Sequence, residues 1–80
     1  MSIDEIREKL ILIIERGSDI PNISPNMDLI LDLGLDSIGY YILIENVEKE
    51  FSVKFSGQDI FTDVTTIEAL SYKIRNLMND

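Results

Sequence analysis

The sequence predicts an all-α protein, a small four-helix bundle. Apolar residues recur at helical spacing in three separate segments, no segment alternates apolar and polar residues as a half-buried strand would, and there is no internal repeat. The chain has 80 residues, of which 45% are apolar, and a chain of this length forms one core rather than two. We therefore expect residues 1–80 to form a single domain.

The first helix is predicted from Ile3 to Glu15, with its end near Gly17, because glycine favours the position that follows a helix. Apolar residues lie on one face of this segment and charged residues on the other, the pattern of an amphipathic helix. The apolar positions, which we expect to face the core, are Ile3, Ile6, Leu10, Ile13 and Ile14.

A long connection follows, from Ser18 to Asp36. Pro21 and Pro25 disfavour helix at their own positions and at the residues before them, so residues 18–26 should be irregular. A connection of this length is uncommon in a compact domain unless it is functional. We expect it to lie across the helices and to contribute its apolar residues to the core; these are Met27, Leu29, Ile30, Leu31, Leu33 and Leu35.

The second helix, predicted from Ile38 to Phe51, has the strongest pattern in the sequence. At about 100° per residue, one narrow stripe is apolar and should face the core. That stripe consists of Tyr40, Leu43, Ile44, Val47 and Phe51, and nearly opposite it lie Ile38, Tyr41, Ile42 and Glu45. An apolar group away from the core is a candidate contact surface for a partner. The alternative is that the long connection covers these residues and makes them part of the core.

Two further helical segments are predicted in the C-terminal third. After a short extended link, Ser52 to Phe55, the sequence Ser56-Gly57-Gln58-Asp59 resembles a capping box and predicts one short turn of helix over Gly57 to Phe61. A clearer box, Thr65-Thr66-Ile67-Glu68, opens the final helix. The core stripe of that helix is Ile67, Leu70, Ile74, Leu77 and Met78.

Composition excludes several classes of function. Fifteen acidic residues against seven basic ones give a net charge of −8, which repels phosphate backbones and anionic lipids, so we expect no nucleic-acid binding and no membrane insertion. The chain has neither cysteine nor histidine, which excludes disulfides, a thiolate nucleophile, a Cys/His zinc site and an imidazole base. An acidic N-terminus and the lack of a long apolar run favour a cytoplasmic protein.

A calcium site is also excluded. Asp32, Gly34 and Asp36 stand at alternating positions, but an EF-hand loop counted from Asp32 would need glycine at Ser37 and glutamate at Leu43. We therefore predict no metal site.

The segment Leu33-Gly34-Leu35-Asp36-Ser37-Ile38 holds the candidate site. If Ser37 is the N-cap, its hydroxyl accepts a hydrogen bond from a backbone N–H of the first turn. If Asp36 is the N-cap, its carboxylate accepts that bond, and Ser37 becomes the first helical residue with its hydroxyl free. Asp36 is favoured, because a negative charge at the positive end of the helix dipole contributes about 0.3–1 kcal/mol. The same end favours a phosphate group on Ser37. Gly34 supplies conformational freedom, and Gly39 is expected to leave an open approach beside the serine.

This motif, the helix ending Val47-Glu48-Lys49-Glu50-Phe51, the link to Phe55 and the Thr65-Thr66-Ile67 helix start together resemble the acyl carrier protein family over nearly the whole chain. The resemblance implies a four-helix bundle of acyl-carrier type, with a long loop between helices 1 and 2 and a short third helix. It implies that Ser37 receives 4′-phosphopantetheine from a transferase that uses coenzyme A, with Asp36 as the helix cap beside it. The thiol of that arm holds an acyl group as a thioester.

The resemblance further implies a monomeric, non-catalytic carrier that is handled by a phosphopantetheinyl transferase and by acyl-loading, condensing or transfer enzymes. Carriers of primary fatty acid synthesis usually have acidic residues where this chain has Gly39 and Ile42. Docking here should therefore rely more on apolar contact, as in a carrier dedicated to a specialised pathway. The expected partner-binding residues are Ile38, Tyr41, Ile42, Glu45 and Glu48.

Two alternative functions remain open. One is a carrier of aminoacyl groups, of the peptidyl or D-alanyl type. The other is a helical protein-binding module in which Ser37 is unmodified and Ile38, Tyr41 and Ile42 form the contact. The net charge of −8 and the Asp before Ser37 favour acyl cargo from fatty acid or polyketide chemistry.

Overall fold

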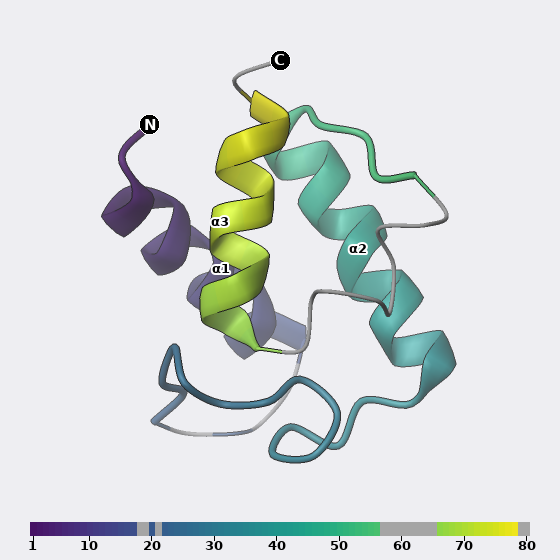
Figure 1. The fold of residues 1–80 in the computed structure, drawn as a ribbon. Coiled ribbons are helices and arrows are strands. Elements are labelled where there is room, and N and C mark those ends of the chain that lie inside the picture. The colour runs from purple at the N-terminus through teal and green to yellow at the C-terminus, as the bar shows by residue number, and fades with distance from the viewer. Residues whose placement is uncertain (18–19, 21, 57–65, 79–80) are drawn as a thin grey trace.

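A computed structural model describes residues 1–17, 20, 22–56 and 66–78. These residues form three helices, α1 (Ile3–Gly17), α2 (Ser37–Phe51) and α3 (Ile67–Met78), and no strand beyond an isolated bridge between Asp28 and Thr66. α1 packs against both α3 and α2, and the connection between α1 and α2 passes below the start of α3 (Figure 1). The all-α prediction is confirmed, while the short helix predicted over Gly57 to Phe61 lies outside the described residues.

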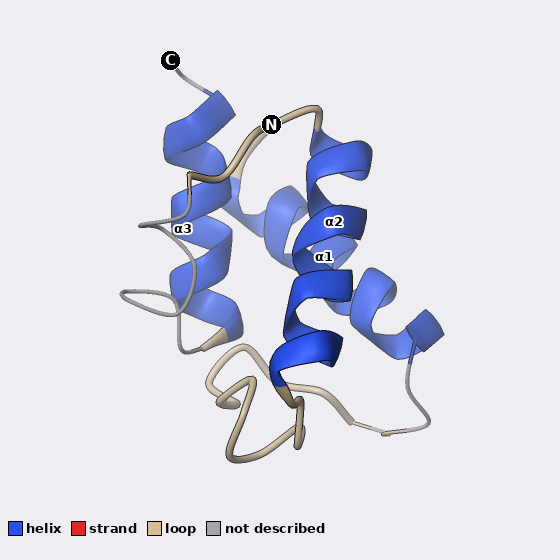
Figure 2. Ribbon diagram, turned by 90° about the vertical axis from the view of Figure 1, so that its right-hand side faces the viewer, coloured by secondary structure: helices blue, strands red, loops and turns tan. Residues whose placement is uncertain are grey.

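The core consists of the apolar stripes that the helical periodicity predicts, and it lies between the three helices that Figure 2 shows in blue. Its helical members are Ile6, Leu10, Ile13 and Ile14 from α1, Tyr40, Leu43, Ile44, Val47 and Phe51 from α2, and Ile67, Leu70 and Ile74 from α3. The predicted core residues at the helix ends, Ile3, Leu77 and Met78, are only half-buried. Ser71 is fully buried and satisfies its hydroxyl by donating to the carbonyl of Ile67 at 2.9 Å.

The start of α1 is closed by a capping box that our sequence analysis missed. The Ser2 hydroxyl accepts from the Glu5 N–H at 3.2 Å, and the Glu5 carboxylate accepts from the Ser2 N–H at 3.1 Å. Each residue thus satisfies a donor that the helix leaves unpaired. The bond from the Ser2 N–H, with help from the Ser2 hydroxyl, lowers the pKa of Glu5.

The start of α3 differs from the predicted capping box. Thr66 caps the helix, since its hydroxyl oxygen accepts from the Ala69 N–H at 3.1 Å. Glu68, which the box would turn back onto its own helix, instead accepts two hydrogen bonds from the guanidinium of Arg7 at 2.9 and 2.7 Å. A planar guanidinium matches a carboxylate in this two-pronged way, so Glu68 joins α3 to α1.

The connection is ordered into a tight turn over residues 28–34. The Asp28 carboxylate accepts from the N–H groups of Ile30 and Leu31, both at 2.8 Å. This turn points Leu29 and Leu33 into the core, because residues four apart lie on one side of a helical turn. The prediction that Ile30 and Leu31 are core residues is wrong: their side chains are 45% and 85% exposed.

The connection is also attached to α3. The N–H groups of Ile67 and Glu68 donate to the carbonyls of Met27 at 3.2 Å and Pro25 at 2.9 Å. A helix leaves its first N–H groups without acceptors. Here two carbonyls of the connection act as acceptors for two of these N–H groups. Met27 and Leu35 are half-buried and pack against the core, as predicted.

Candidate functional site

Asp36 is the N-cap of α2. Its backbone is extended, with φ −87° and ψ −176°, and its carboxylate accepts from the Gly39 N–H at 2.7 Å. Its carbonyl accepts the first helical bond, from the Tyr40 N–H at 2.9 Å. Of the two helix starts considered above, the structure has the one in which Ser37 is the first helical residue. The Ser37 side chain is exposed and is not needed to cap the helix.

The backbone around Ser37 favours an anion. The first N–H groups of a helix have no helical acceptor, and Asp36 satisfies only that of Gly39. The N–H groups of Ser37 and Ile38 therefore remain at the positive end of the helix dipole. Such an end stabilises a phosphate group by hydrogen bonds and by its partial charge.

Two glycines shape this turn for different reasons. Gly34 has φ +70°, in the left-handed region where residues with a side chain are strained. At Gly39 a Cβ would lie 3.2 Å from Oδ1 of Asp36 and 3.4 Å from Cδ2 of Leu35. The lack of a side chain at Gly39 therefore makes room for the capping carboxylate.

The side of α2 away from the core is uncovered. Ile38, Tyr41 and Ile42 are 72%, 51% and 52% exposed, and Glu45 is exposed beside them. The alternative that the connection buries this apolar group is wrong, because the connection turns inward at Leu33 instead.

Glu48 lies apart from the other predicted partner-binding residues. It is half-buried, and its carboxylate accepts from the Phe55 N–H at 2.8 Å. Ser52 ends α2 in the left-handed conformation, with φ 55°, which turns the chain back so that this bond forms. Glu48 therefore holds the link that follows α2, a role that our sequence analysis did not foresee.

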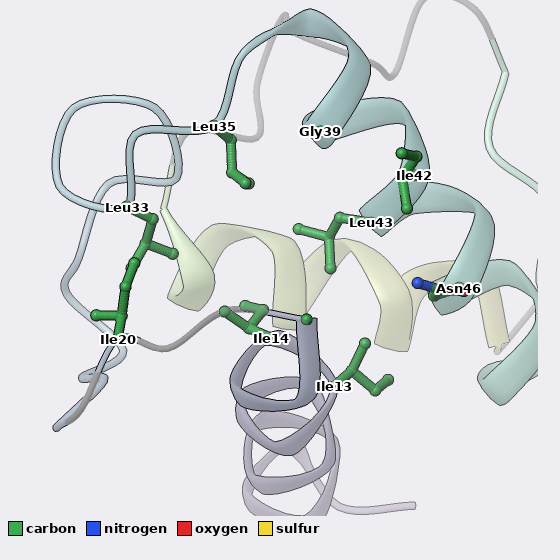
Figure 3. Close-up of a pocket in the computed structure, with 10 residues that line it drawn as sticks. Ile13, Ile14, Ile20, Leu33, Leu35, Gly39, Ile42, Leu43 and Asn46 are labelled. Carbon is green, nitrogen blue, oxygen red and sulfur yellow. The ribbon is translucent and has the colours of Figure 1, made fainter.

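A cavity of about 190 Å³ lies between the end of α1, the connection and the first half of α2. Figure 3 shows Ile13 and Ile14 of α1 below it, Ile42 and Leu43 of α2 above it, and Asn46 at one end. The cavity was not predicted from the sequence. The signal that could have indicated it is a pair of glycines, Gly17 and Gly39, which both line the cavity and add no side chain to fill it.

The region that holds Ser37 is uniformly acidic. Between Arg16 and Lys49 the sequence has no lysine or arginine, and its acidic residues are Asp19, Asp28, Asp32, Asp36, Glu45 and Glu48. Within the described part of the chain, no group of three or more potential ligands is placed to hold a metal ion. None of the three helices has the length and apolar character needed to cross a bilayer, as far as the described residues extend.

These observations define a class of protein: a small helical domain that presents a serine at a helix N-terminus suited to a phosphate group. The sequence matches, over residues 4–72, the family described as the phosphopantetheine attachment site. It is also 31% identical over 72 residues to a protein named acyl carrier protein from Desulforapulum autotrophicum, covering 90% of this chain and 94% of that relative. The chain belongs to this family, as the sequence resemblance predicted, and it is a carrier rather than an enzyme.

The cofactor of the family is 4′-phosphopantetheine, and the residues at the start of α2 fit it. Ser37 offers an exposed hydroxyl there, and the adjacent N–H groups suit a phosphate group at this position. The arm supplies a thiol, which the chain lacks because it has no cysteine.

Proposed function

We propose that Ser37 is the attachment residue and that the protein carries acyl groups as thioesters between the enzymes of a fatty acid, polyketide or specialised biosynthetic pathway. The observation that carries this proposal is the Asp36 cap. Because Asp36 accepts from the Gly39 N–H at 2.7 Å, the helix starts without using the Ser37 hydroxyl. The relative named acyl carrier protein and the net charge of −8 favour acyl over aminoacyl cargo.

Loading requires the Ser37 Oγ to attack the phosphorus of coenzyme A that bears the pantetheine. A new P–O bond forms at Oγ, and the P–O bond to the departing adenosine bisphosphate breaks. The Oγ proton passes to a base of the transferase, since this chain has no histidine to accept it. The part of this chain is to hold Oγ at a fixed point on α2 and to stabilise the phosphate with the Ser37 and Ile38 N–H groups.

Intact-mass spectrometry tests the attachment. After incubation with coenzyme A and a broad-specificity phosphopantetheinyl transferase, the wild type should gain one phosphopantetheinyl group and Ser37→Ala should gain none. Ser56→Ala, which removes another exposed hydroxyl, should be modified like the wild type. An unmodified wild type, or a modified Ser37→Ala variant with a normal circular dichroism spectrum, would overturn the proposal.

We also propose that partner enzymes dock on Ile38, Tyr41 and Ile42, with Glu45 at the rim. Exposed apolar groups rimmed by charge mark interaction sites, and the acidic region around this one complements an apolar surface bordered by lysine and arginine. A protein with eight excess negative charges is less suited to self-association, so we expect it to act as a monomer.

Ile38→Glu tests the docking surface. The side chain is 72% exposed, so the melting temperature should hardly change. Loss of an interface centre residue typically costs more than 1 kcal/mol, so kcat/KM of the transferase should fall by about fivefold or more. The matched control is Leu12→Glu, which makes the same kind of change at a 52% exposed position of α1. An equal loss in both variants would show that added charge, and not this surface, is responsible.

A further inference from the structure

Two carboxylates close the turn that leads into α2. Oδ1 of Asp28 accepts from the N–H groups of Ile30 and Leu31, both at 2.8 Å, and Oδ2 of Asp32 accepts from the Asp28 N–H at 2.7 Å. The Asp28 carbonyl accepts from the N–H groups of Asp32 at 3.0 Å and Leu33 at 3.1 Å. Asp28 thus bonds to the turn through its N–H, its carbonyl and its side chain, and no other residue of the turn does so in the described chain.

The turn is also fixed to the core and to α3. Leu29 is fully buried and Leu33 is 8% exposed, so the core holds two of its side chains. On the other side of Asp28, the Met27 carbonyl accepts from the first N–H of α3 at 3.2 Å, and Asp28 itself forms a bridge with Thr66. The place of the turn relative to the helices is therefore set by contacts on both sides of Asp28.

The hydrogen bonds of the turn continue almost to Ser37. The Leu35 N–H donates to the Leu29 carbonyl at 3.2 Å, and Leu35 directly precedes the Asp36 cap. The Leu35 side chain also lies beside Gly39 in the first turn of α2 (Figure 3). No free linker therefore stands between the turn and the serine, and a loosened turn leaves the entry into α2 less well held.

We propose that Asp28 is a positioning residue for the loading of Ser37, a role that rests on the proposed carrier function. Only two residues separate the turn over 28–34 from Ser37, so an enzyme that reaches this hydroxyl also contacts the turn. A turn that must be ordered on binding costs conformational entropy, which a preformed turn avoids. Loss of the Asp28 carboxylate therefore weakens the encounter with the transferase and leaves the chemical step at Ser37 unchanged.

Steady-state loading by a phosphopantetheinyl transferase tests this role, with coenzyme A saturating and the concentration of the carrier varied. Asp28→Ala should raise KM for the carrier by about fivefold, the effect of one hydrogen bond of typical strength, and change kcat by less than about twofold. Asp28→Asn keeps an oxygen that accepts from the N–H groups of Ile30 and Leu31, so it should return KM to within about twofold of the wild-type value.

Two control variants separate positioning from charge and from global stability. Glu8→Ala removes an exposed acid from α1 and should leave KM at the wild-type value. Ile74→Val shortens a fully buried side chain of α3, which lowers stability without touching the turn. KM should again be unchanged in this variant.

Amide hydrogen exchange of the unmodified chain measures the turn without any loading. In Asp28→Ala the N–H groups of Leu33 and Leu35 should exchange about fivefold faster relative to the N–H of Val47, a buried residue of α2 whose protection shows that the variant is folded. Unchanged relative exchange would overturn the role of Asp28.

The kinetic outcomes are equally decisive. A wild type that is not loaded would refute the proposed function, and the role of Asp28 with it. In a wild type that is loaded, the role of Asp28 alone is overturned by an unchanged KM in Asp28→Ala, by a loss confined to kcat, by an Asp28→Asn variant as defective as Asp28→Ala, or by an equal rise of KM in either control.

Discussion

Replacement of Asp36 by alanine should destabilise the protein through the start of α2. The substitution removes the 2.7 Å bond to the Gly39 N–H and the negative charge at the positive end of the helix. Loss of an N-cap side chain costs about 0.5–2 kcal/mol. Because the bond is short and the charge is well placed, we expect a loss of about 1–2 kcal/mol. In a domain of this size the melting temperature should then fall by about 5–15 °C.

Two companion variants isolate the cap. Asp36→Asn keeps an acceptor for the Gly39 N–H and removes only the charge, so it should cost about 0.3–1 kcal/mol. Glu45→Gln removes an exposed acid in the middle of α2 and should change stability by less than about 0.5 kcal/mol. Urea unfolding followed by circular dichroism gives the change in the free energy of unfolding for each of the three variants, provided that the m-value stays constant. The reasoning is refuted if Asp36→Asn costs as much as Asp36→Ala, or if the alanine variant matches Glu45→Gln.

Three further predictions concern the core, the acid response and the cap. Phe51→Ala should lower the free energy of unfolding in urea by about 3–5 kcal/mol, because the Phe51 ring is 5% exposed and lies beneath the Lys9 ammonium. A loss below about 1 kcal/mol would show that the ring does not belong to the core. Folding lowers the pKa of Glu5, so the ionised Glu5 carboxylate stabilises the folded protein above the ordinary pKa of 4.5, and this stabilisation is lost as the pH falls through the lowered pKa. Glu5→Gln should therefore flatten this part of the acid-unfolding curve. An unchanged curve would show that Glu5 does not contribute to the acid response. Gly39→Ala should be more favourable in the Asp36→Ala background than in the wild type, because its Cβ would lie 3.2 Å from the Asp36 carboxylate; additive effects in the double-mutant cycle would show that the two do not interact.

The helices and the geometry at Asp36 could be predicted because both depend on nearby residues. A stripe such as Tyr40, Ile44 and Val47 follows from the helical repeat alone. The choice between Asp36 and Ser37 as the cap depends on the charge of two neighbouring side chains and one helix dipole. No distant part of the chain is needed for either inference.

The remaining features depend on contacts that periodicity does not encode. The capping-box pattern predicts that Glu68 turns back onto α3, but Arg7, 61 residues away, offers it two hydrogen bonds. Five of the seven positions from Leu29 to Leu35 are apolar, so composition does not tell which of these side chains turn inward. The Asp28 carboxylate decides this by closing a turn that exposes Leu31.

The attachment of the connection to α3 has a consequence for the order of folding. The carbonyls of Pro25 and Met27 meet the N–H groups of Glu68 and Ile67 about forty residues further along the chain. Closing so long a loop is entropically costly and is reached slowly compared with contacts inside one helix. We therefore expect the start of α3 to be completed late, after α1 and α2 have formed. Substitutions at Thr66 should speed unfolding and leave the refolding rate nearly unchanged, which stopped-flow measurements would detect.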